Sequence, residues 1–295
     1  MKHERIETGL SLMLEEQFHD AVQPLLDAGE VDILEWSFDM AWNGSLPFRV
    51  ETLLHEFSTT GHLLGHGVSF SPLSGHWSER QDAWLRMLQD TLQRTPMRHI
   101  SEHFGFMEAG NFHQAPPLPV PRTEETLAVG RDRLQRLADV SRLPVGLENL
   151  AFAFSLSDVR QQGQFLEELL EPVQGFLVLD LHNIYCQSCN FGVCAGELIG
   201  SYPLNRVREL HVSGGSWSDV IADGNTRTLR RDTHDGPVPN EIFPLVESVL
   251  SRCPNLEAVI LEHLGTALDC PGDADQLRAD YRQLRQIVSR HRDQM

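Results

Sequence analysis

Short apolar runs alternate with helical patterns along the whole chain, and this alternation constrains the fold more than any other feature. The apolar runs are predicted to be strands: Ile6–Leu14, Val31–Phe38, His62–Phe70, Arg98–Phe106, Pro144–Leu150, Phe176–Leu179, Val207–Ser213 and Leu256–His263. Apolar residues at helical spacing separate them, for example in Ser78–Leu92 and Gln276–Val288. Eight such units without a linker predict one (β/α)8 TIM barrel, a single domain over residues 1–295.

The sixth run shows how these strands end. In Gly175–Tyr185 (GFLVLDLHNIY), four apolar residues follow Gly175 and suit a strand that is buried on both faces. The run then stops at Asp180, His182 and Asn183, which are potential metal or proton ligands. Such residues do not suit a core, so the end of this strand is predicted to be functional.

Composition excludes several classes of protein. With 41% hydrophobic residues the chain can bury a core, but it has no run of eighteen apolar residues, so no membrane span is expected. The start, MKHERIETG, lacks the apolar segment of a signal peptide, which predicts a cytoplasmic protein. A formal net charge of −18 argues against general nucleic-acid binding, because phosphate contacts come from Lys and Arg.

Three of the five cysteines, Cys186, Cys189 and Cys194, lie close together after the sixth strand. A C-x-x-C pair permits zinc binding or redox chemistry, but no second pair completes a structural zinc site. We expect reduced thiols in a loop, and the sequence assigns them no role.

His or carboxylate residues close six different strands. In a TIM barrel the active site forms at the C-terminal ends of the strands, so these side chains should converge at the mouth of the barrel. Asp232 and His234, in the segment DTHDGPVP, are two residues apart and can point the same way. The strand-end residues are His66, His103, Glu148, Asp180 with His182 and Asn183, His211 and Glu262.

A single such histidine is more often structural, but repetition over six strands favours a metal centre. Carboxylates with imidazoles suit iron, manganese or zinc. The candidates outnumber the ligands of one ion, so two or three ions bridged by carboxylates such as Glu148 are expected. Glu35 and Asp39, near the end of the second strand, could line the pocket or support ligands. His263 should point away from the neighbouring Glu262.

The ordered set of motifs resembles one family, the multinuclear non-haem iron-dependent oxidative enzymes, to which the methanobactin biosynthesis enzyme MbnB belongs. The matching segments are HGVSFS, ISEHFGF, PLPVPRTEE, GLENL, LDLHNIY, RVRELHVSG, DTHDGPVP and ILEH, from about residue 62 to residue 263. Three features depart from the family pattern: His182 replaces a second Asn, His263–Leu264 replaces Trp–Asp, and the cysteine cluster is unusual. These departures bear on the substrate and on the iron environment.

The resemblance implies a xylose-isomerase-like TIM barrel that holds two or three irons of mixed Fe2+/Fe3+ state. It implies oxidation by dioxygen of a residue, often cysteine, in a ribosomally made precursor peptide, which a small partner protein presents. Glu148, Asp180 and His211 are the expected catalytic residues, and Glu35, Asp39, His182 and His263 are expected to support ligands or contact substrate. The implied ligands are His66, His103, Glu148, Asp180, Asn183, His211, Asp232, His234 and Glu262.

Other classes of protein remain open at this point. A zinc phosphodiesterase like the apurinic endonucleases shares the barrel, but there a His follows the carboxylate of strand six by three residues, whereas here Asn183 follows Asp180. The acidic chain is also a poor partner for DNA. A divalent-metal sugar isomerase would show Lys beside the metals and few histidines. A metal-binding scaffold without activity is the non-enzymatic alternative.

Overall fold

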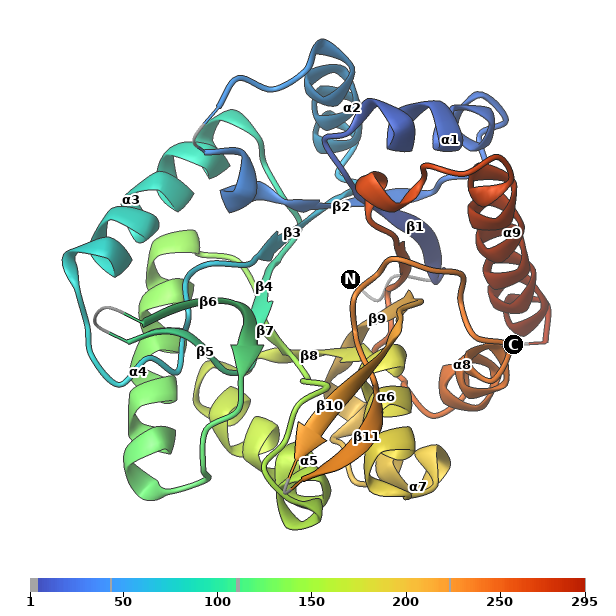
Figure 1. Cartoon of the computed structure of the whole chain (residues 1–295). Helices are drawn as coiled ribbons and strands as arrows, with labels where there is room; N and C mark the ends of the chain where they lie inside the picture. Colours follow the sequence, from blue (N-terminus) through green and yellow to red (C-terminus); the bar gives the residue numbers. More distant parts are fainter. Residues whose placement is uncertain (1–4, 43, 110–111, 223, 295) are drawn as a thin grey trace.

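Eight parallel strands close into a barrel in the computed structural model, which describes residues 5–42, 44–109, 112–222 and 224–294 (Figure 1). The order around the barrel is β1-β12-β9-β8-β7-β4-β3-β2, and β2 pairs with β1. This confirms the predicted TIM barrel. The strands are β1 (Glu7–Leu12), β2 (Ile33–Ser37), β3 (Leu63–Gly67), β4 (Ile100–His103), β7 (Val145–Glu148), β8 (Phe176–Asp180), β9 (Val207–Ser213) and β12 (Ala258–Glu262).

Helices cover the outside of the barrel (Figure 1). Their apolar stripes face the strands; in α3, for example, Trp84, Leu85 and Leu88 are buried. Thr123 caps the start of α4, because its hydroxyl accepts a hydrogen bond from the Thr126 amide. The helices are α1 (Glu16–Asp27), α2 (Phe48–Thr59), α3 (Glu79–Arg94), α4 (Glu124–Ser141), α5 (Leu156–Leu170), α6 (Leu181–Phe191), α7 (Ala195–Ile199), α8 (Ile242–Leu250) and α9 (Asp273–Arg292).

The barrel interior divides into an apolar part and a polar part. Ile33, Leu64, Ala258 and Ile260 form a small buried cluster of their own, separate from the main core between strands and helices. Every residue of β8 is buried because helices cover its outer face and side chains fill the inner one. The polar part lies toward the C-terminal ends of the strands, where the predicted site residues are.

Two antiparallel hairpins extend beyond the barrel strands and were not predicted. One joins β5 (Phe106–Ala109) to β6 (Phe112–Leu118), so the Pro-rich segment at 115–122 begins inside a strand. Proline is tolerated there because an edge strand has amides without partners. The other joins β10 (Trp217–Ala222) to β11 (Asn225–Arg230), directly after β9. Four short 3-10 turns complete the described elements: η1 (Phe38–Ala41), η2 (Glu171–Val173), η3 (Leu204–Arg206) and η4 (Gly265–Ala267).

Helix α6 was also left unassigned by the sequence, although it begins immediately after β8. Asp180 caps it, because its Oδ1 accepts a hydrogen bond of 2.5 Å from the Asn183 amide. Asp180 is therefore both the last residue of β8 and the cap of α6. Among the described residues no helix has the length and apolar character needed to span a membrane.

Candidate metal centre

The structure brings eight of the nine predicted ligands into overlapping groups at the mouth of the barrel. Within each group the ligand atoms lie within 4.8 Å of one another. Three groups follow one another across the mouth: His66, His103 and Glu148; then Glu148, Asp180, His211 and Glu262; then Asp180, Asp232 and His234. Asn183, the ninth, lies in the first turn of α6 beside Asp180.

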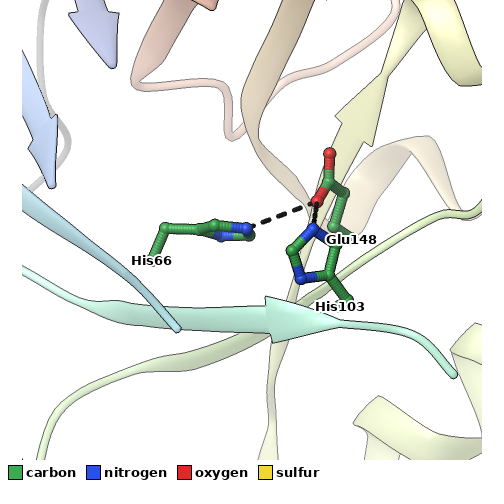
Figure 2. A group of neighbouring side chains, drawn as sticks. All are labelled: His66, His103 and Glu148. Carbon is green, nitrogen blue, oxygen red and sulfur yellow. Dashed lines mark ion pairs between the residues drawn. The ribbon is translucent and has the colours of Figure 1, made fainter. Parts of the chain in front are cut away.

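The first group places two imidazoles against one carboxylate oxygen. His66 Nε2 is 3.5 Å and His103 Nε2 is 3.3 Å from Glu148 Oε2. Figure 2 draws these two ion pairs as dashed lines that meet at the carboxylate. The Ser101 hydroxyl donates to the Gly65 carbonyl and so accepts from His66 Nδ1, 2.8 Å away, which leaves Nε2 without its proton. Burial, with His103 and His211 nearby, holds the pKa of His66 well below its ordinary value. His66 is therefore neutral, the form that binds metals.

The second group surrounds His211 with carboxylates. His211 Nδ1 lies 3.1 Å from Glu148 Oε1 and 3.3 Å from Glu262 Oε2. Burial opposes a charge on His211, but Glu262 and the other carboxylates outweigh it and raise its pKa well above the ordinary value. Burial likewise raises the pKa of Glu262, but His211 and His234 outweigh it and hold that pKa at about 2.

Asn149 fixes the position of Asp180, a role that was not predicted from the sequence. Its side-chain oxygen accepts from the Asp180 amide at 2.7 Å and its NH2 group donates to the Asp180 carbonyl at 3.1 Å. The Asn149 carbonyl also accepts from the Asn183 side chain at 2.8 Å. All three residues are buried, so Asn149 holds two predicted ligands in place, Asp180 through its side chain and Asn183 through its main-chain carbonyl. The clue in the sequence is the position of Asn149, directly after Glu148.

Two members of the third group, Asp232 and His234, lie on the segment between β11 and α8, and the third, Asp180, ends β8. His234 Nε2 lies 2.9 Å from Asp232 Oδ1. His234 has a φ of 52°, in the left-handed region that a residue with a Cβ seldom adopts, and its carbonyl accepts from the Leu264 amide at 2.8 Å. Backbone strain of this kind persists where surrounding contacts enforce it and is concentrated at functional sites.

Buried polar atoms without a hydrogen-bond partner test whether a metal fits here. Within the described residues they include Asp180 Oδ2, Asn183 Oδ1, Glu262 Oε2 and His103 Nδ1. Leaving such atoms unpaired is costly, and a cation would satisfy the oxygens. Burial, together with Asp232 and Glu148, raises the pKa of Asp180 well above its ordinary value, and a cation would remove that repulsion. The oxygen and nitrogen donors fit iron, manganese or zinc.

Beneath the three groups lies a buried layer that supports His211. Glu35 Oε2 is 3.0 Å from His211 Nε2. Glu209 Oε1 is 3.6 Å from the same nitrogen, and Glu209 Oε2 is 2.8 Å from His99 Nε2. Glu209 and His99 were missed, although Glu209, two residues before His211, had to share its side of the strand. An Nε2–H bond to a carboxylate leaves Nδ1 of His211 for a metal.

We expect Glu35→Gln to weaken the pH dependence of stability in the metal-free protein. Burial raises the pKa of Glu35 from its ordinary value of 4.5 to about 8, although His211 acts in the opposite direction. Between these values the folded state binds the extra proton, so Glu35 makes stability fall as pH rises. Urea unfolding of chelator-treated protein at pH 5 and pH 8 measures the change. The variant should lose less stability than the wild type, by on the order of a few kcal/mol; equal losses would contradict the assignment.

The other predicted supporting residues lie around the groups rather than in them. Asp39 accepts from the amides of Val68 and Ser69 and from Trp84 Nε1, so it holds the chain that follows His66. His182 Nδ1 lies 2.9 Å from Asp232 Oδ1. His263 is buried, its Nδ1 lies 3.0 Å from the Leu264 carbonyl, and it belongs to none of the groups formed by the described residues.

Two further features complete the surroundings of the groups. Glu102, which was not predicted to take part, accepts hydrogen bonds from the amides of Phe70 at 2.7 Å and His103 at 2.9 Å. The expectation of a loop was wrong for two of the cysteines, because Cys186 and Cys189 lie on α6. Cys186 is buried, Cys189 and Cys194 are exposed, and all three are free thiols outside the groups found in the described chain. Burial raises the pKa of Cys186, so this thiol is not activated.

Comparison with known proteins gives both a family and a fold. The sequence matches the model of the family described as RiPP precursor modification enzyme MbnB/TglH/ChrH over residues 22–288. A UPF0276 protein of Caulobacter vibrioides is 30% identical over 244 residues, which cover 82% of this chain and 81% of that protein.

Solved structures agree with the barrel. D-psicose 3-epimerase from Clostridium cellulolyticum H10 superposes with a TM-score of 0.56 at 13% identity, covering 98% of this chain and 97% of that one. A xylose isomerase-like TIM barrel protein from Mycobacterium smegmatis gives 0.57 at 12% identity, covering 98% and 99%. At such low identity the likeness shows only a xylose-isomerase-like TIM barrel.

Proposed function

The chain belongs to the family of RiPP precursor modification enzymes that includes MbnB, TglH and ChrH, and from this premise we propose that it oxidises a residue of a ribosomally synthesised precursor peptide. Cysteine is the residue we expect to be modified, with dioxygen as co-substrate and a centre of two or three irons in mixed Fe2+/Fe3+ state. We also propose that the whole chain acts as one domain and that a small partner protein presents the peptide.

The observation that carries this proposal is the sharing of ligands between neighbouring groups. Glu148 belongs to the first and second groups, and Asp180 belongs to the second and third. Carboxylates can bridge two ions, and bridged ions a few ångströms apart form a multinuclear centre. His66 and His103 would hold one ion, His211 and Glu262 the next, and Asp232 and His234 the third, with Asn183 beside Asp180.

Bound iron would supply one-electron chemistry with dioxygen and would favour the thiolate form of a cysteine ligand. The protein's own residues prepare the donor atoms for it. Ser101 holds His66 in the tautomer with a free Nε2. Glu35 accepts from Nε2 of His211, so Nδ1 is the nitrogen that would bind a metal once its proton is displaced. Asn149 keeps Asp180 at the shared position.

A peptide substrate is supported by the distribution of exposed apolar side chains. Among the described residues, six of the seven exposed large apolar side chains lie in the turns, loops and hairpins that follow the C-terminal ends of barrel strands: Met40, Phe112, Phe154, Trp217, Ile221 and Leu264. The seventh, Phe48, begins α2 and lines a groove against α1. Exposed apolar residues collected on one face indicate contact with a macromolecule more than with a small polar sugar.

The two alternative activities fit less well. A sugar isomerase with Lys beside its metals is disfavoured because the only lysine in the sequence, Lys2, precedes the first strand. A zinc phosphodiesterase would share the donor atoms but gains nothing from apolar side chains around its mouth, and its polyanionic substrate would meet a chain of charge −18.

Elemental analysis with Mössbauer spectroscopy, on protein expressed in iron-rich medium, tests the proposal. We expect two or three irons per chain, partly ferrous and partly ferric. Mass spectrometry should then show oxygen-dependent modification of a short Cys-bearing peptide encoded beside the gene, and an anaerobic sample is the control. Zinc alone, with iron excluded even under iron supplementation, would favour the hydrolase instead. Protein without any metal would contradict the site itself.

A further inference from the structure

Arg230, the last residue of β11, is a buried arginine beside the third metal group. Only 7% of its surface is exposed. Its guanidinium carbon lies 5.6 Å from the ring centres of both Tyr185 and Trp217. Within the described ranges no carboxylate forms an ion pair with Arg230, so the guanidinium must have another hydrogen-bond partner.

That partner is His182. Arg230 Nε lies 3.2 Å and Nη2 lies 3.0 Å from His182 Nε2. A guanidinium can only donate, so Nε2 must accept and the ring proton must be on Nδ1. Nδ1 in turn lies 2.9 Å from Asp232 Oδ1. The hydrogen bonds therefore run in one direction, from Arg230 through His182 to a candidate metal ligand.

The surroundings of Arg230 fix this relay in place. Asn190 accepts from the Arg230 amide at 2.8 Å and donates to its carbonyl at 2.9 Å. Asn190, His182 and Tyr185 all lie on α6, so the contacts that Arg230 makes with these three residues all come from one helix. On the other side, His182 packs closely against Gly215, where an added Cβ would lie 2.7 Å from His182 Cε1, so a side chain at position 215 would displace the imidazole.

We propose that Arg230 is a positioning residue for the third metal group, Asp180, Asp232 and His234, and that it acts through His182. The inference rests on the proposed function in one respect only, that this group binds a metal. By fixing the His182 tautomer, Arg230 keeps an N–H directed at Asp232 and so holds that carboxylate in its ligating orientation. It also ties the β10–β11 hairpin, with its exposed Trp217 and Ile221, to the metal centre.

The test is the binding of Fe2+ alone, added anaerobically and quantified by elemental analysis after equilibrium dialysis, with Mössbauer spectra of the loaded protein. Arg230→Gln should weaken binding of one ion about 10- to 100-fold, the usual effect of removing a supporting contact. The signals of the remaining ions and the circular dichroism spectrum should not change. Arg227→Gln is the matched control, because Arg227 is an exposed arginine on the same strand.

Variants at position 182 separate positioning from a general structural effect. In a His182→Leu background, Arg230→Gln should cause no further loss, because the relay is already broken. His182→Gln should restore binding, since its amide can accept from Arg230 and donate to Asp232. If Arg230→Gln fails to fold, Arg230→Lys, which keeps a donor and the charge, should retain more binding than His182→Leu.

Unchanged Fe2+ affinity in Arg230→Gln, or an equal loss with and without His182, would overturn the relay. Repeating the titration with Zn2+ separates this result from the proposed function. A wild-type chain that binds Zn2+ at this group but excludes iron contradicts the iron oxidase, and a Zn2+ affinity weakened by Arg230→Gln would still support the relay. A wild-type chain that binds neither ion at Asp232 and His234 overturns both.

Discussion

Glu148→Gln and Asp180→Asn should each remove more than one metal ion, whereas His103→Asn should remove only one. The two carboxylates are shared between neighbouring groups, but His103 belongs to a single group at the edge of the centre. An amide keeps the size of the side chain but loses the charge that bridges two cations, so the bound metal should fall to about one equivalent or less. Activity should fall with it. Elemental analysis after dialysis gives the count.

The fold should survive both substitutions. Asparagine is itself a good helix cap, so Asp180→Asn can still begin α6. Without metal, both variants also remove a carboxylate from a crowded acidic cluster, and their thermal unfolding should occur at or above that of the metal-free wild type. Asp280→Asn is the matched control, because Asp280 is a buried carboxylate on α9 outside the groups. Full metal content in Glu148→Gln and Asp180→Asn would contradict the shared-ligand geometry.

The barrel was predictable because a strand that is buried on both faces consists of consecutive apolar residues, which are easily recognised in the sequence. All eight barrel strands overlap the predicted apolar runs, and β8, with the sequence FLVLD, is the clearest case. The hairpin of β10 and β11 leaves no such mark. Most of β11 is exposed, so nothing selects for apolar alternation there. Helix α6 was missed because its first residues read as a continuation of the strand before it.

The site was predictable only as far as topology alone brings residues together. Parallel strands place His66, Glu148 and Asp180 at one end of the barrel whatever the details of packing. Hydrogen-bond partners that depend on strand register or on a side-chain rotamer could not be predicted. The pairing of Ser101 with His66 follows from the alignment of β3 with β4, and the contact of Glu209 with His99 crosses the interior of the barrel. Neither contact can be predicted from the sequence alone.

Gly214 and Gly215, directly after β9, show the same dependence on close packing. The backbone of the segment that carries Asp232 and His234 rests on them. A Cβ at Gly214 would lie 2.2 Å from the carbonyl oxygens of Gly236 and Pro237, and one at Gly215 would lie 2.2 Å from the Arg231 oxygen. These are backbone atoms, which cannot turn aside as the end of a flexible side chain can.

Gly215→Ala should therefore damage both stability and metal binding. The segment must move away from β9, which should cost about 1–3 kcal/mol of unfolding free energy. Because Asp232 and His234 move with it, the ion of the third group should be lost while those held by Glu148 and His211 remain. Urea unfolding and elemental analysis measure the two effects.

Gly75→Ala is the matched control, since Gly75 also lies in a loop after a barrel strand but nothing lies within 4 Å of its added Cβ. It should leave both measurements unchanged. If Gly215→Ala lowered stability and yet kept every ion, the third group would not depend on the position of this segment. Loss of all ions together would show instead that the centre assembles as one unit, with the glycines supporting the whole mouth of the barrel rather than one edge of it.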